Sequence, residues 1–146
     1  MAKSFAQSKG ARGEREVVQL LQPIIDRVYL DCGKEPISLL RNSLQSREGG
    51  YDLIGLDWLA LEVKRCETLN LNAWTKQCID QAKAGQTPVL IYKQNNRAWK
   101  VMMHSTLIIY GGSTNIRVWS EISLESFLCY FEYRLKHESG KGSKTI

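Results

Sequence analysis

The sequence predicts a single α/β domain in which helices flank a mixed β-sheet. Its length of 146 residues is that of one compact domain. Helical and strand-like periodicities alternate along the chain. The hydrophobic content of 43% provides a core without support from disulfides or metal. We therefore expect a basic flexible arm over residues 1–10, a folded domain over residues 11–137 and a disordered tail over residues 138–146.

The first expected element is a helix over residues 13–30. Its apolar positions follow the i, i+3, i+4, i+7 stripe of a helix that lies on a core. These positions are Val17, Leu20, Leu21, Ile24, Ile25 and Val28. Pro23 falls inside the stripe, and because proline removes a backbone donor, we expect it to kink or split the helix. Gly33 provides a turn or cap after the helix.

The middle of the chain reads as strands. Residues 37–45 are predicted as a strand, although the same segment also fits a short helix. Residues 46–50 form a loop by composition, and strands over residues 51–56 and 59–65 follow, joined by a tight turn around Asp57. The remaining expected elements are a helix over 72–85, a hairpin of strands 89–93 and 99–104 around 94–97, a short strand over 116–119 and a helix over 124–136.

The cysteine spacing argues against a zinc site, and the net charge indicates a polyanionic partner. Four cysteines, Cys32, Cys66, Cys78 and Cys129, are scattered without the close spacing of a zinc site. We expect reduced thiols in a cytoplasmic protein. The apolar runs are too short to span a membrane, and the first ten residues lack the apolar segment of a secretory signal. A net charge of +5 fits a polyanionic partner such as nucleic acid.

The hairpin around Asp57 brings chemically active side chains together. A turn centred on this residue places Asp52 directly opposite Glu62, and directly paired Cβ atoms lie about 5 Å apart. Lys64 projects from the same face of the strand as Glu62. Two carboxylates bind Mg²⁺ through oxygen, and the bound cation activates a water for phosphodiester hydrolysis. The ammonium can orient that water or stabilise charge on the phosphate.

This pattern resembles the PD-(D/E)xK nuclease superfamily, with Asp52 and Glu62-Val63-Lys64 matching its Asp…Glu-x-Lys core. The family's proline before the aspartate is replaced here by Tyr51. Within the superfamily the chain is most similar to archaeal-type Holliday-junction resolvases and their small phage-encoded relatives. Their Lys-Gly-x-x-x-Glu-Arg-Glu motif occurs here over residues 9–16. The similarity covers residues 9–103.

The resemblance implies a restriction-endonuclease-like fold over residues 11–137. It also implies a Mg²⁺-dependent DNA endonuclease, with Mn²⁺ as a substitute cation. Such an enzyme acts in DNA recombination and repair by cutting four-way or branched DNA as a homodimer, in the cytoplasm of the host if it is phage-encoded. Symmetric cleavage of a junction needs two active sites related by a two-fold axis. Apolar surface for the dimer could come from residues 108–110 or 127–135.

The resemblance further implies Glu14 as the first acidic residue of the site, reaching the metal directly or through water. Glu16 is the other candidate, and the Gly-x-x-x-Glu spacing favours Glu14. Members of the superfamily commonly place a glutamine of the second helix beside the site. Gln77 and Gln81 are both candidates and share one helical face with Trp74, which could equally be a core residue.

The expected DNA contacts are cations that lie near the site residues in the sequence. They are Lys9, Arg12, Arg15, Arg41, Arg47 and Arg65. Each alone reads as an ordinary surface charge, whereas the group indicates a basic rim. Gly49 and Gly50 would let the backbone approach a duplex closely.

Three alternative functions remain open. The first is another PD-(D/E)xK DNA nuclease, of the replication-repair or restriction type, without junction specificity. The second is a non-catalytic DNA-binding module on the same scaffold, although such a module would be expected to have lost its acidic residues. The third is an RNA-directed or protein-interaction role, for which the chain carries no aromatic RNA-binding signature.

Overall fold

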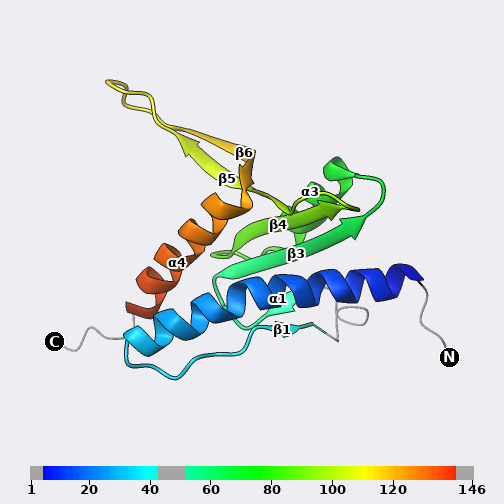
Figure 1. Ribbon diagram of the computed structural model, residues 1–146. Coiled ribbons are helices and arrows are strands. Elements are labelled where there is room, and N and C mark those ends of the chain that lie inside the picture. Colours follow the sequence, from blue (N-terminus) through cyan, green and yellow to red (C-terminus); the bar gives the residue numbers. More distant parts are fainter. Residues whose placement is uncertain (1–4, 43–51, 141–146) are drawn as a thin grey trace.

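A mixed β-sheet forms the centre of the fold, and helices cover both of its faces (Figure 1). The computed structural model describes residues 5–42 and 52–140, with side chains from Gly10 onward. These residues form one α/β domain with six strands and three helices. In chain order the elements are α1 Phe5–Asp31, β1 Leu40–Arg41, β2 Leu53–Ile54, β3 Leu59–Cys66, α3 Leu71–Gln81, β4 Thr87–Gln94, β5 Lys100–Leu107, β6 Ile116–Ser123 and α4 Leu124–Gly140.

The six strands lie in the sheet in their order along the chain, from β1 to β6. Strands β3 and β4 are parallel, and every other neighbouring pair is antiparallel. A parallel pair needs a crossover connection, and helix α3 supplies it. The predicted mixed sheet and the predicted order of elements are both confirmed.

Alternate residues of the central strands face two separate cores. On one face, Leu61 and Ile91 pack with Val17 of α1 and Phe127 of α4. On the other face, Leu90 and Tyr92 of β4 pack with Trp74 and Cys78 of α3. The middle of β3 is therefore buried on both sides, and the even-numbered residues of this strand face α3.

Helix α1 is continuous, so the prediction that Pro23 would split it is wrong. Pro23 is exposed, while Leu21 and Ile25 on either side of it are fully buried. The core contacts on both sides hold the helix together across the one backbone donor that proline lacks. The helix begins at Phe5, inside the segment 1–10 that was expected to be a basic arm.

Other boundaries differ from the sequence-based expectation at their ends. Helix α3 ends at Gln81, and Gly85 occupies a turn with a φ of +86° instead of ending the helix. Strand β1 has only two residues, and residues 43–51, which include the predicted loop, lie outside the described residues. Helix α4 continues to Gly140, so the first three residues of the expected tail are helical.

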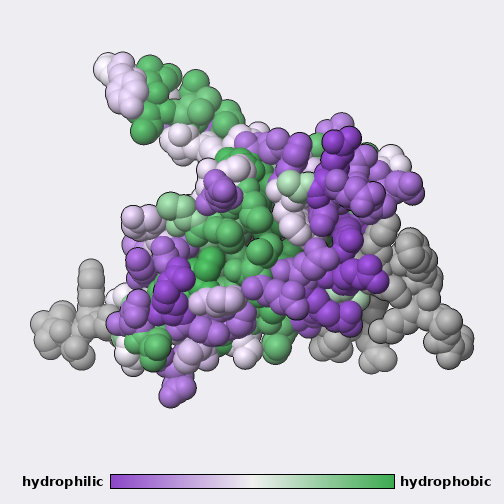
Figure 2. Space-filling view, viewed as in Figure 1, coloured by the Kyte–Doolittle hydropathy of each residue, from purple (hydrophilic) through white to green (hydrophobic). Residues whose placement is uncertain are grey.

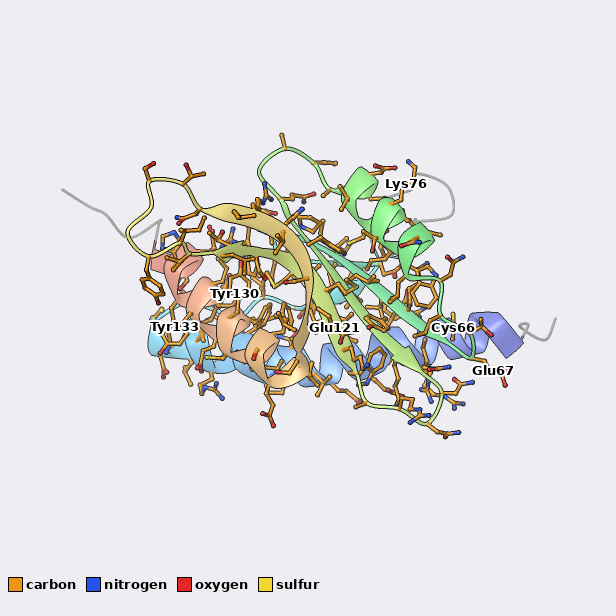
Figure 3. All side chains as sticks on the ribbon, turned by 90° about the horizontal axis from the view of Figure 1, so that it is seen from above. Cys66, Glu67, Lys76, Glu121, Tyr130 and Tyr133 are labelled. Atoms are coloured by element: carbon orange, nitrogen blue, oxygen red, sulfur yellow. The ribbon has the colours of Figure 1, made fainter. Side chains whose placement is uncertain are left out.

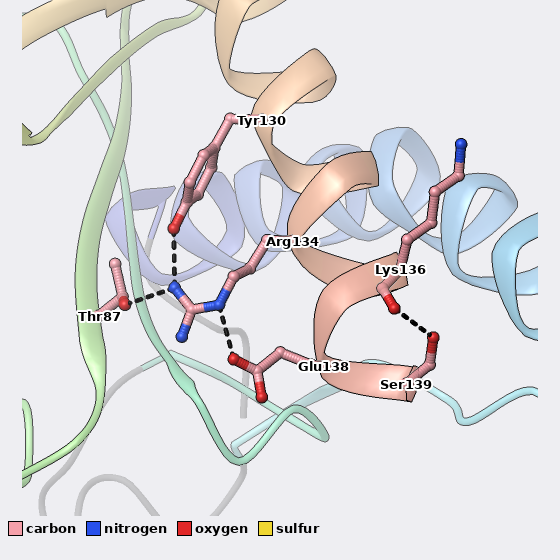
Figure 4. Close-up of polar contacts among 6 residues, drawn as sticks. All are labelled: Thr87, Tyr130, Arg134, Lys136, Glu138 and Ser139. Carbon is pink, nitrogen blue, oxygen red and sulfur yellow. Dashed lines mark hydrogen bonds and ion pairs between the residues drawn. The ribbon is translucent and has the colours of Figure 1, made fainter. Parts of the chain in front are cut away.

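Arg134 of α4 ties this helix to the sheet (Figure 4). Its guanidinium donates hydrogen bonds to Thr87 Oγ1 at 3.0 Å, to the Tyr130 hydroxyl at 2.8 Å and to Glu138 Oε1 at 2.8 Å. The same group lies 4.5 Å from the ring centroid of Trp58, in the turn between β2 and β3. One side chain thus joins α4, β4 and the hairpin that carries the predicted site.

Strands β5 and β6 form a long hairpin that projects away from the rest of the molecule (Figure 1). The strands are paired along their full length, from Lys100 with Ser123 at the base to Leu107 with Ile116 near the tip. The sequence predicted shorter strands here. Among the described residues, no helix has the length and apolar character that crossing a membrane requires.

Candidate active site

The hairpin of β2 and β3 places Asp52 beside Glu62. Leu53 pairs with Leu61, which is the register that a turn centred on Asp57 predicts. Asp52 Oδ2 accepts a hydrogen bond of 2.7 Å from the backbone N–H of Val63. The carboxylate of Asp52 is therefore fixed by the strand that carries Glu62 and Lys64.

Gly55 allows this hairpin to form. Its φ is +137°, a value that side chains disfavour, and a methyl group there would lie 2.7 Å from the carbonyl oxygen of Ser38. Glycine at this position lets β2 lie close to the segment before β1. The same approach holds Asp52 at the start of β2.

Glu62 is a fully buried glutamate next to a second buried carboxylate. Burial, the charge of Asp52 and a hydrogen bond shared with Asp52 together raise the pKa of Glu62 to about 8. The Lys64 ammonium lowers the pKa of Glu62. Ionisation of both Asp52 and Glu62 is therefore unfavourable, and a cation bound between the two carboxylates would compensate their negative charges.

The two oxygens of Glu62 differ in their surroundings. Oε1 accepts a hydrogen bond of 3.1 Å from Gln77 Nε2 and lies 3.5 Å from Lys64 Nζ. Oε2 is buried and has no hydrogen-bond partner within the described part of the chain. A buried carboxylate oxygen without a donor is an incomplete site, and a hard cation is the ligand that completes it best.

Helix α3 brings Gln77, and not Gln81, onto Glu62. The two glutamines are four residues apart, so Gln81 lies one turn farther along the helix, and its Oε1 is buried without a hydrogen-bond partner in the described structure. Trp74 packs on Tyr92 in the core beneath α3, with ring centroids 6.3 Å apart. Of the two glutamines that the sequence offered, the structure therefore brings Gln77 to Glu62, and Trp74 is a core residue.

Helix α1 brings Glu14 near Asp52. Gly13 lies close to β3, where a methyl group would be 3.2 Å from Arg65 Cβ, so the helix runs tightly along the strand. Burial raises the pKa of Glu14, and the charge of Asp52 adds to this. Arg41 opposes both effects, because its Nε donates a hydrogen bond of 2.6 Å to Glu14 Oε2.

Glu16 points to a different partner. It forms an ion pair with Arg65 at the end of β3. Figures 1 and 3 show this end of β3, marked by Cys66 and Glu67, beside the N-terminal half of α1. Glu14 is therefore the helix α1 carboxylate that interacts with the Asp52 side of the site.

Cys78 lies next to the two carboxylates but is not a chemical participant. Burial raises the pKa of its thiol to about 12, and the charges of Glu62 and Asp52 contribute. The thiol therefore stays protonated and packs as a small apolar side chain in the core under α3.

The donor set suits a divalent cation at one point of the sheet. Asp52 and Glu62 offer adjacent carboxylate oxygens, and Glu14 is held by Arg41 on the α1 side. In the ranges 5–42 and 52–140, no cluster of three or more His, Cys, Asp or Glu side chains is placed to hold a metal. Glu14 would have to exchange Arg41 for a metal-bound water, or for the metal itself, to complete a three-carboxylate site.

The basic side chains that were expected to contact DNA differ in their exposure and in their ion pairs. Arg12 and Arg15 are exposed on α1. Arg41 and Arg65 are ion-paired with Glu14 and Glu16, so they are not free cations. The side chains of Lys9 and Arg47 lie outside the described residues.

The sequence did not point to a cationic hollow beside the site. A hollow of about 330 Å³ is lined by Leu69, Tyr92, Gln94, Arg97, Ala98 and Lys100. Tyr92 pairs with Lys64 in the β3–β4 register, so the hollow lies one strand away from the candidate lysine. Only the parallel pairing of β3 with β4, which is not local in sequence, brings Arg97 and Lys100 to this place.

Comparisons with known proteins add no further constraint. No protein-family model matches the chain, and no curated protein or solved structure is significantly similar to it. The function is therefore inferred from the geometry of Asp52, Glu62 and Lys64 and from the Asp…Glu-x-Lys motif that they form.

Proposed function

We propose that the protein is a metal-dependent DNA endonuclease that hydrolyses phosphodiester bonds, with Asp52, Glu62 and Lys64 at the centre of its active site. The observation that carries this proposal is the burial of Glu62 against a second carboxylate with an ammonium 3.5 Å away. Burying such a group is costly unless it has a function or a complete set of partners. Strongly perturbed carboxylates of this kind cluster at functional sites.

Asp52 and Glu62 are the residues that would hold Mg²⁺ or Mn²⁺, and Glu14 would join them directly or through water. A divalent cation bound there polarises the phosphoryl oxygen and lowers the pKa of a coordinated water. Gln77 restrains the Glu62 carboxylate through its hydrogen bond to Oε1. This contact is the kind of outer interaction that orients a metal ligand.

Lys64 supplies the positive charge of the site. Its ammonium lies on the same face of β3 as Glu62 and is partly exposed, so it can reach a bound phosphate. There it would position the attacking water or stabilise the charge that develops on the phosphate. A neutral residue at this position would leave the metal site intact but weaken catalysis.

The substrate that we propose is four-way or branched DNA, cut by a homodimer in the cytoplasm, of the host if the protein is phage-encoded. The resemblance to Holliday-junction resolvases, which the Asp…Glu-x-Lys residues and the motif over residues 9–16 carry, supports this substrate. The exposed Arg12 and Arg15, with the exposed Arg97 in the hollow beside Lys64, offer phosphate contacts on either side of the site.

Cleavage of a synthetic four-way junction, beside a linear duplex of the same arm sequences, tests the proposal. Wild type with Mg²⁺ should give paired symmetric nicks on the junction, and Glu62→Gln should lose at least about 1,000-fold in rate. Glu67→Gln is the matched control, because Glu67 is an exposed glutamate just beyond the end of β3.

The other outcomes distinguish the alternatives. Equal cutting of junction and linear duplex would retain the nuclease and exclude junction specificity. Binding of DNA without cleavage in either Mg²⁺ or Mn²⁺ would favour a non-catalytic DNA-binding module on the same scaffold.

A further inference from the structure

The projecting hairpin of β5 and β6, which we call the arm, has an apolar tip. Five large apolar side chains near the tip are strongly exposed: Leu107 53%, Ile108 64%, Ile109 45%, Tyr110 92% and Ile116 48%. The segment from residue 107 to 116 contains no charged residue. Figure 2 shows this apolar surface on the arm and more apolar surface on the body below it. Exposed apolar patches of this kind mark interaction sites.

Strand β6 also leaves one edge of the sheet open. It is the last strand in the sheet order and pairs only with β5 among the described strands. One of its faces is fixed to α3, because Trp119 Nε1 donates a hydrogen bond of 3.1 Å to Thr75 Oγ1. A long unpaired edge is a template for pairing with another strand.

The base of the arm carries a partly apolar hollow. It has a volume of about 540 Å³ and is lined by residues 98–100, which lead into β5, and by residues 121–125, which connect the end of β6 to the start of α4. Each strand of the arm has eight residues. At about 3.3 Å per residue, the tip of the arm lies roughly 26 Å from this hollow. The tip therefore cannot occupy the hollow of its own chain.

We propose that the arm joins two copies of this chain. The two arms lie antiparallel about a two-fold axis, with their β6 edges side by side and each tip seated in the hollow at the base of the other arm. An arrangement of this kind is self-complementary, as a two-fold interface requires. This interface rests on the homodimer of the proposed function, but it is tested separately from catalysis, because the dimer forms whether or not Glu62 is catalytic.

The exposed area favours a second copy over a one-sided partner. At about 150–200 Å² for each large apolar side chain, the exposed fractions amount to roughly 500 Å² on each tip. One tip and the hollow that receives it would together bury about 1,000 Å², which is below the standard size of a stable interface. Two reciprocal contacts double this to about 2,000 Å², which reaches that size.

The charges on the arm favour protein over DNA as its partner. Affinity for DNA depends on contacts between cations and phosphates, and the tip offers no cation. Antiparallel pairing of the β6 edges centred on Trp119 would instead set Arg117 opposite Glu121 of the partner subunit. Within its own chain Glu121 contacts Tyr92 and Lys100, and Arg117 contacts His104, so the pair across the axis would be added to these contacts. Unlike charges directly opposite one another stabilise a strand pair.

The mass of the full chain in solution, measured by light scattering or sedimentation without DNA, tests the proposal. Wild type should have twice the mass of the 16.7 kDa chain at concentrations of about 10 µM. Ile108→Asp combined with Tyr110→Asp should be monomeric, with a dissociation constant raised at least about 100-fold. Tyr133→Asp is the control, because Tyr133 is also strongly exposed, at 66%, but lies on α4 (Figure 3), and this variant should remain a dimer.

A charge exchange tests the antiparallel arrangement. Arg117→Glu should weaken the dimer, and adding Glu121→Arg should restore it, because the pair is re-formed with its charges reversed. The proposal is overturned by a monomeric wild type or by a tip variant that remains dimeric. Failure of the exchange to restore the dimer overturns the antiparallel pairing. A monomeric wild type whose tip variant loses junction binding would assign the arm to DNA.

Discussion

Replacing Glu62 by glutamine should stabilise the cation-free protein at alkaline pH while it removes catalysis. The pKa of Glu62 is raised to about 8 by burial and by Asp52, from an ordinary value of 4.5. Between these two pH values the folded protein keeps a proton that the unfolded chain has released. The stability of the wild type therefore falls as the pH rises from 4.5 through 8, whereas glutamine has no proton to lose.

The size of the effect follows from the two pKa values. A difference of one pKa unit corresponds to about 1.4 kcal/mol, so the full penalty is at most about 5 kcal/mol. Part of it, about 1 kcal/mol, is already present at pH 5, which leaves about 4 kcal/mol between pH 5 and pH 8.5. Glutamine has nearly the shape of a protonated glutamate, so the two proteins should be about equally stable at pH 5.

Urea denaturation of wild type and Glu62→Gln at both pH values, in the presence of a chelator, measures this difference. Glu67→Gln is the control, and its stability relative to wild type should not depend on pH, because Glu67 is exposed. Excess Mg²⁺ in place of the chelator should stabilise wild type at pH 8.5, and Glu62→Gln much less. The reasoning is refuted if Glu62→Gln is no more stable than wild type at pH 8.5 in the chelator.

Three further substitutions test the positions around the site. Gln77→Ala should lower the cleavage rate at limiting Mg²⁺ by about 10-fold to 100-fold without changing the melting temperature, while Gln81→Ala should have little effect, since only Gln77 contacts Glu62. Gly55→Ala should lower the free energy of unfolding by at least about 2 kcal/mol in urea titrations, because the added methyl group meets a backbone oxygen at 2.7 Å. Arg134→Met should lower the free energy of unfolding by about 2–3 kcal/mol, since three hydrogen bonds are lost. A loss below about 0.5 kcal/mol for Gly55→Ala or for Arg134→Met would contradict the packing described.

The parts of the fold that were predictable from the sequence are those set by local pattern. The apolar stripe of α1 is periodic enough to define a helix, and the turn at Asp57 fixes the register of β2 and β3 because both strands are adjacent in the chain. That register is what places Asp52 beside Glu62. The ends of elements were less predictable. Helix α3 stops before Gly85, and β5 extends past its predicted end because its outer part is exposed and carries no burial pattern. Strand β6 continues past residue 119 to Ser123, next to the start of α4.

Choices between neighbouring candidates depended on contacts between distant segments. Gln77 and Gln81 share a helical face, and only the packing of α3 over β3 brings one of them to Glu62. Glu14 and Glu16 differ by two positions on α1, and thus by about 200° around the helix axis. The close approach of Gly13 to β3 determines which of the two carboxylates lies near Asp52 and which lies near Arg65.

The ion pair of Glu14 and Arg41 connects the predicted metal site with the predicted DNA contacts. Arg41 was expected to contact DNA, yet its Nε is bound to the carboxylate that would complete the metal site. Burial and the charge of Asp52 raise the pKa of Glu14, whereas Arg41 lowers it, so the arginine favours the ionised form of this carboxylate while no cation is present. A divalent cation would supply the same electrostatic effect more strongly. Arg41 would then be released toward the substrate phosphates, so that metal binding and DNA binding would reinforce each other.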